Sequence, residues 1–115
     1  MEESGRGRSS MVELEMTGAE CIAAERRRQV EECGWDARHD DSHRGGSLAV
    51  NAAELAVAHT DAQVERPNGD VDPWGLVARV PDTLRRLEIA GALIAAEIDR
   101  LQRQRIADAR PADRG

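Results

Sequence analysis

The chain is poor in aromatic residues. It has no Phe and no Tyr, and Trp35 and Trp74 are its two tryptophans. Hydrophobic residues make up 40% of the 115 residues, but Ala supplies many of them. Because a domain of this length buries a small core even when its side chains are large, we expect one thinly packed domain. Self-association or a bound ligand would add to its stability.

Lysine is also absent, so all 16 basic residues are Arg. The formal net charge is −6. General nucleic-acid binding requires a basic surface, and this balance of charge argues against it. The basic side chains that are present are planar donors that suit carboxylates and phosphates.

Long apolar runs are missing as well. No stretch approaches the eighteen or so apolar residues of a membrane-spanning helix, and the first residues lack the apolar segment of a secretion signal. Cys21 and Cys33 fall in one expected helix, where twelve residues span about 18 Å, too far for a disulfide. We therefore expect reduced thiols, no membrane partner and a cytoplasmic protein.

The longest helical pattern covers residues 82–106. Its apolar residues recur at alternating spacings of three and four, the rhythm of a coiled-coil seam, at Leu84, Leu87, Gly91, Ile94, Ile98 and Leu101. The small residues around Gly91 would let another backbone come close. This helix is expected to be either the core helix of a small bundle or the seam of a homo-oligomer.

Two shorter helices are expected before it. Thr17 and Glu20 form a capping box that opens a helix over residues 18–33, with Gly34 as its C-terminal stop. The expected apolar face of that helix is Ala19, Ile22, Ala23, Val30 and Cys33. Ser47 is a plausible N-cap for a second helix over residues 48–59. The sequence thus predicts an all-α, three-helix domain over residues 17–107, with loops at 36–46 and 60–80 and mobile tails at 1–16 and 108–115.

One polar cluster carries possible chemistry. His39, Asp40, Asp41 and His43 supply two imidazoles and two carboxylates, which are ligands for zinc, while the adjacent carboxylates alone would suit magnesium. Glu31, Glu32 or Glu54 could complete such a metal site. A nucleotide phosphate could bind next to the metal at the start of the helix after Ser47. Alternatively, Asp40 or Asp41 pairs with arginine, either within 26–28 or at 85 and 86, and holds the loop down.

No sequence signature assigns catalytic residues. The chain lacks a nucleophile elbow, a phosphate-binding loop and a dinucleotide fingerprint. Whether the protein is an enzyme therefore stays open at this point.

Several segments, in the same order and spacing, resemble a group of small helical proteins from phages, prophages and actinobacteria with no defined activity. They are Glu25-Arg26-Arg27-Arg28-Gln29, Gly34-Trp35, His39-Asp40-Asp41 with His43, and residues 90–101 (AGALIAAEIDRL). The chain departs from that group at Ser47, where Glu is usual, and at Leu55, where an aromatic is usual. The resemblance implies a phage-type accessory protein that acts by binding or self-association.

A more distant similarity is to MazG-like all-α nucleotide pyrophosphohydrolases, which hold magnesium with acidic residues on facing helices. Glu31-Glu32 and Glu97 with Asp99 are the nearest pieces of their motifs, and neither has the usual spacing. A divalent-metal-dependent nucleotide hydrolase is therefore the alternative function.

Overall fold

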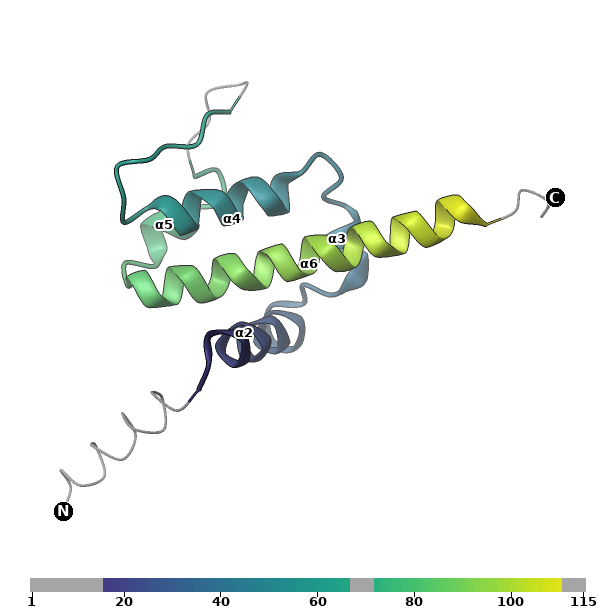
Figure 1. The fold of residues 1–115 in the computed structure, drawn as a ribbon, viewed down its shortest axis with the longest axis horizontal. Coiled ribbons are helices and arrows are strands. Elements are labelled where there is room, and N and C mark those ends of the chain that lie inside the picture. The colour runs from purple at the N-terminus through teal and green to yellow at the C-terminus, as the bar shows by residue number, and fades with distance from the viewer. Residues whose placement is uncertain (1–15, 67–71, 111–115) are drawn as a thin grey trace, which may run out of the picture.

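The computed structural model describes residues 16–66 and 72–110, whose regular structure is helical with no strand among them (Figure 1). The all-α fold class is confirmed. The helices are α2 (Gly18–Cys33), α3 (Ala37–Asp41), α4 (Ser47–Val57), α5 (Leu76–Arg79) and α6 (Thr83–Ala109). The predicted tails lie outside the described residues except at residue 16 and at residues 108–110, where α6 and its end continue beyond the expected boundary.

The long helix α6 lies between α4 on one side and α2 on the other (Figure 1). The apolar core is formed where α4 meets α6, and its fully buried leucines are Leu48, Leu55 and Leu93. Trp35 and Trp74 are partly buried against this core. The scarcity of aromatics therefore gives a small core in which alanines take many of the buried positions, namely Ala52, Ala90, Ala92 and Ala96.

The ends of α2 follow the sequence prediction. The Oγ1 of Thr17 accepts a hydrogen bond from the Glu20 amide at 3.1 Å, and the Glu20 carboxylate accepts one from the Thr17 amide at 2.8 Å. Gly34 ends the helix with φ 73°, a left-handed conformation that favours glycine. Both caps are local features, so the sequence alone locates them.

The predicted apolar face of α2 is wrong. Most of its members are exposed, and the two buried residues of α2 are Glu25 and Gln29. Glu25 is buried because α6 supplies Arg85, whose guanidinium lies 2.6 Å from its carboxylate, while Arg28 of α2 donates to it at 2.9 Å. A buried carboxylate is tolerated when charge and hydrogen bonds are both satisfied.

Close approach of α2 and α6 occurs at Gly91. A Cβ atom built on Gly91 would lie 2.6 Å from Cγ1 of Ile22, so a larger residue would displace that side chain. The small residue at the middle of the predicted seam is therefore used within the chain, as a crossing point for α2.

Two short helices were not predicted. Asp36 caps α3 by accepting a hydrogen bond from the His39 amide at 3.0 Å, so the His/Asp cluster lies on a helix and its exit, not in a loop. The Asp72 carboxylate accepts hydrogen bonds from the amides of Val77 and Ala78, each at 3.0 Å, and stabilises the first turn of α5. At α4, Gly46 is the N-cap and Ser47 is the first helical residue, which shifts the predicted start by one position.

The face of α6 that carries the predicted seam is largely exposed. Asp82 caps the helix, and the first seam residue, Leu84, is 71% exposed. The other large seam residues are between 38% and 51% exposed, namely Leu87, Ile94, Ile98 and Leu101. We call these five residues the exposed stripe.

Two further features are the state of the cysteines and the lengths of the helices. Cys21 and Cys33 are free and lie on the same helix. Among the described residues, every helix is too short or too polar to cross a bilayer.

Candidate functional site

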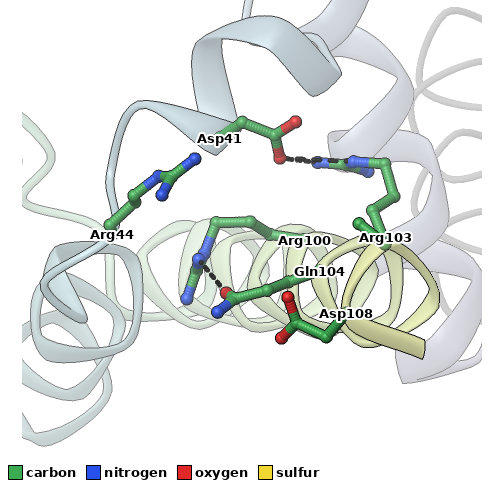
Figure 2. A pocket seen from close by; sticks show the side chains of 7 residues that line it. Asp41, Arg44, Arg100, Arg103, Gln104 and Asp108 are labelled. Carbon is green, nitrogen blue, oxygen red and sulfur yellow. Dashed lines mark hydrogen bonds and ion pairs between the residues drawn. The ribbon is translucent and has the colours of Figure 1, made fainter. Parts of the chain in front are cut away.

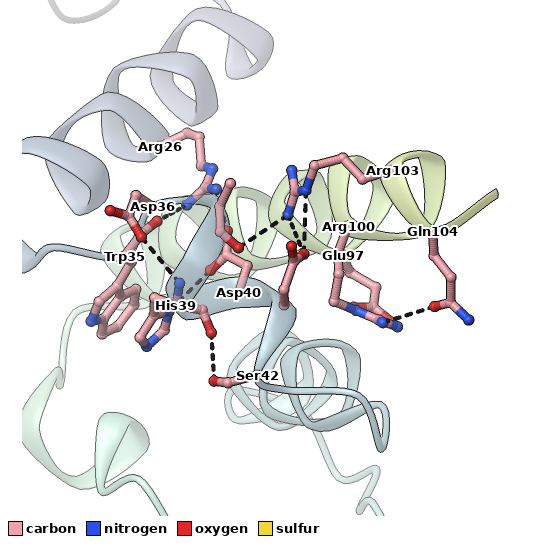
Figure 3. A network of polar contacts seen from close by, with 12 residues as sticks. Arg26, Trp35, Asp36, His39, Asp40, Ser42, Glu97, Arg100, Arg103 and Gln104 are labelled. Atoms are coloured by element: carbon pink, nitrogen blue, oxygen red, sulfur yellow. Dashed lines mark hydrogen bonds and ion pairs between the residues drawn. The ribbon is translucent and has the colours of Figure 1, made fainter. Parts of the chain in front are cut away.

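The predicted cluster lies on and just after α3, between α2 and α6 (Figure 3). Asp40 is the buried member, with 1% of its surface exposed. Its carboxylate forms an ion pair with Arg26 of α2 and accepts a hydrogen bond from Nδ1 of His39 at 3.0 Å. Arg26 also donates to the carbonyl of Trp35 at 2.9 Å. Asp40 thus joins α2 to α3, which is the Arg pairing that the sequence offered as the alternative to metal binding.

Asp41 points toward α6. Its Oδ1 accepts hydrogen bonds from Arg103 at 2.7 and 3.2 Å, and Arg103 also lies 3.4 Å from the carbonyl of Ala37. The hydrogen bond from Arg103 is the main reason that the pKa of Asp41 lies below its ordinary value. The two adjacent carboxylates therefore face different helices, and they do not form a common magnesium site.

The histidines belong to a continuous row of four rings. Trp35 stacks on His39 with centroids 5.6 Å apart and planes 4° apart, and His39 meets His43 at 4.8 Å. The ring centroids of His43 and Trp74 are 5.0 Å apart, and the two rings are arranged edge to face. Residues from the end of α2, from α3 and from the segment before α5 are brought together in this way.

These four rings line a cavity of about 210 Å³ together with Leu76 and Arg79. Burial and the charge of His39 lower the pKa of His43, while Asp40 opposes the shift. Nδ1 of His43 shares a hydrogen bond of 3.2 Å with the Ser47 hydroxyl. The cavity is therefore lined by aromatic rings and by two imidazoles, the side chains best able to bind a ligand there.

A second cavity, of about 230 Å³, lies beside the C-terminal part of α6 (Figure 2). Three arginines line it, but Arg100 is bonded twice to Glu97 and Arg103 is bonded to Asp41. Figure 2 shows Arg44 on the other side of the Asp41 carboxylate from Arg103. Because two of its three cations are already paired, this cavity offers little to an anion.

The remaining predicted ligands lie elsewhere. Glu31 and Glu32 are exposed on α2, and Glu54 binds Arg66 at 2.8 and 3.0 Å. Within residues 16–66 and 72–110, no group of three or more His, Cys, Asp or Glu side chains is placed to hold a metal ion. Of the predicted ligands in the His/Asp cluster, the structure brings His39 and His43 together, and Asp40 is hydrogen-bonded to His39.

Sequence reasoning missed the polar contact between α2 and α6. Gln29 is fully buried and donates to Glu25 at 3.1 Å, and its Oε1 has no partner in the described structure. Burial opposes ionisation of Glu25, but the hydrogen bonds and charges of Arg28 and Arg85 outweigh it, so its pKa is lowered. The spacing of four residues between Glu25 and Gln29 places both on one face of a helix, and it was the sequence feature that could have indicated this contact.

Sequence reasoning also missed the contact of Trp74 with His43, because Trp74 reaches the histidines from a segment about thirty residues away. Comparison of the chain with protein-family models, with curated proteins and with solved structures gave no match.

Proposed function

We propose that this protein acts by binding, as a small helical accessory protein that associates with a second copy of itself through the exposed stripe of α6. The observation that carries the proposal is the exposure of five large aliphatic side chains at coiled-coil spacing on one helix. Single exposed aliphatics are ordinary, but several of them on one face of a helix are typical of an interaction surface.

The stripe is separate from the face of α6 that packs on α4. The core face uses Ile89, Leu93 and Ala96, which are at most 5% exposed, whereas Ile94 and Ile98 beside them are about half exposed. A soluble helix with one buried face needs only one apolar face. α2 covers the middle of this second apolar face at Gly91, and the large exposed aliphatic side chains on either side of it favour a further packing partner.

A second copy of this chain is the partner that the stripe fits best. Rows of large side chains at alternating spacings of three and four interlock with another row of the same kind, and a two-fold dimer supplies such a row. The exposed neighbours Asp99, Gln102 and Arg105 carry one acid, one amide and one base. Two copies can therefore meet along the stripe without an excess of like charge, although the whole chain carries −6.

The arrangement of acidic groups favours binding over nucleotide hydrolysis. A metal-dependent hydrolase of the MazG-like kind needs several carboxylates facing one ion. Here Glu31 and Glu32 are exposed, Asp41 is bonded to Arg103, and Glu97 is bonded to Arg100.

Sedimentation velocity over a range of protein concentrations tests the proposal. The variant Ile98→Glu/Leu101→Glu places two carboxylates in the stripe and should shift the protein to monomer. Ile106→Glu is the matched control, because Ile106 is 64% exposed on the same helix but lies off the stripe. A wild type that stays monomeric at all concentrations, or equal association of the two variants, would refute the proposal.

A further inference from the structure

We infer that His39 and His43 form a binding site for a late first-row transition-metal ion, such as Cu²⁺, Ni²⁺ or Zn²⁺, with water completing its coordination. The site needs neither carboxylate of the cluster as a ligand. It is independent of the exposed stripe, so its test does not depend on whether the protein self-associates.

The distance between the rings fits two ligands of one ion. With metal–nitrogen bonds of about 2.0–2.1 Å, the centres of two imidazoles on a tetrahedral ion lie about 5 Å apart. The centroids of His39 and His43 are 4.8 Å apart, and the planes are tilted by 58°.

The outer hydrogen bonds of both rings are those of metal-binding histidines. A ligating imidazole usually donates its second N–H to a carboxylate or another oxygen, which fixes the tautomer and the ring orientation. Asp40, held by Arg26, lies 3.0 Å from Nδ1 of His39, and Ser47 lies 3.2 Å from Nδ1 of His43. In the described structure neither Nε2 has a hydrogen-bond partner, so both are available to an ion.

The surroundings favour nitrogen-bound transition metals over magnesium. The two histidines line one cavity between Trp35 and Trp74, where about 210 Å³ leaves room for an ion and its waters. Two imidazoles suit Cu²⁺, Ni²⁺ and Zn²⁺, whereas magnesium prefers oxygen ligands. The guanidinium of Arg79 at the same cavity donates to the carbonyls of Trp74 and Gly75, which places its charge toward the backbone.

The chain contains its own reporter for this site. Its two tryptophans are the two that flank the histidines, and it has no tyrosine. Titration of tag-free protein with Cu²⁺ or Ni²⁺ should therefore quench the intrinsic fluorescence and saturate near one ion per chain. His39→Gln and His43→Gln should each remove the saturable phase, whereas Ser47→Ala should weaken binding by about tenfold through the outer hydrogen bond.

His59→Gln is the matched control, since His59 is the remaining histidine and is exposed just after the end of α4. Quenching that is unchanged in His39→Gln and His43→Gln, or lost in His59→Gln, would overturn the inference. If circular dichroism shows that the cavity variants do not fold, electron paramagnetic resonance of Cu²⁺ bound to the wild type tests the site instead. Coupling to two imidazole nitrogens supports the site, and coupling to fewer than two overturns it.

Discussion

The two sides of α6 are held to their neighbouring helices by different interactions. On the α4 side, leucines and alanines are removed from water and form the apolar core. On the α2 side, one aliphatic contact at Gly91 is accompanied by the buried Glu25, which α2 and α6 together surround with arginine. Apolar burial contributes most of the stability, while paired buried charges mainly fix how two helices fit together. We therefore expect α4 to determine the stability and α2 the arrangement.

The largest effect should come from the apolar side. Leu93→Ala removes a side chain that is 1% exposed and leaves a cavity against α4, at a cost of about 2–5 kcal/mol of unfolding free energy. Ile94→Ala, one residue along and 47% exposed, should cost much less in the monomer. Urea unfolding at low protein concentration compares the two, and similar losses would remove the distinction between the faces of α6.

The next effect concerns the crossing of α2 over α6. Gly91→Leu should destabilise the protein by about 1–3 kcal/mol, because the new side chain overlaps Ile22. Shortening the neighbour in Ile22→Ala/Gly91→Leu should recover part of that loss in thermal melts. A Gly91→Leu protein that melts at or above wild type would show that α2 does not cross here.

The ion pairs of Glu25 predict a dependence on pH. Because the native pKa of Glu25 lies below its ordinary value of 4.5, its pairing contributes fully above that value and is lost as the pH falls through the lower native pKa. Glu25→Gln should therefore cost about 1 kcal/mol at pH 7 and progressively less below about pH 4.5. Urea unfolding midpoints of wild type and Glu25→Gln, measured at pH 7 and below about pH 4.5, test this. A difference in stability between the two proteins that grows as the pH falls would contradict it.

The smallest effect should come from the pair between Arg103 and Asp41. Both side chains are partly exposed, at 36% and 48%, so water and salt screen their attraction. Arg103→Ala should lower the melting temperature least of the four variants, and about 1 M NaCl should remove the difference from wild type. A large loss that persists in high salt would mean that this pair holds α3 in place.

The sequence was most informative where structure is local. Thr17, Glu20 and Gly34 set the ends of α2 through contacts within a few residues, and the periodicity of the last helix located α6. The helices α3 and α5 were missed because five and four residues are too few to show a helical period. The local evidence for them was an aspartate before each helix, Asp36 and Asp72, whose carboxylate accepts hydrogen bonds from amides of its first turn.

The candidate site was predictable only in part, for the same reason. His39 and His43 are four residues apart, so their proximity could be expected from the sequence. The partners of Asp40 and Asp41 come from α2 and α6, and Trp74 comes from the segment before α5. Likewise, hydrophobicity could not identify Glu25 as buried, because its burial depends on Arg85, sixty residues away.

The position of α2 over Gly91 sets up a competition between an internal and an external partner. Gly91 is the midpoint of the row from Leu84 to Leu101, so α2 divides the exposed stripe into two parts. A tether as short as the one from Gly34 to α3 gives α2 a high effective concentration at that point. If the protein self-associates as we propose, a second copy can use the full row only by displacing α2, and the strength of the Glu25 pairing then limits how much of α6 is open to it.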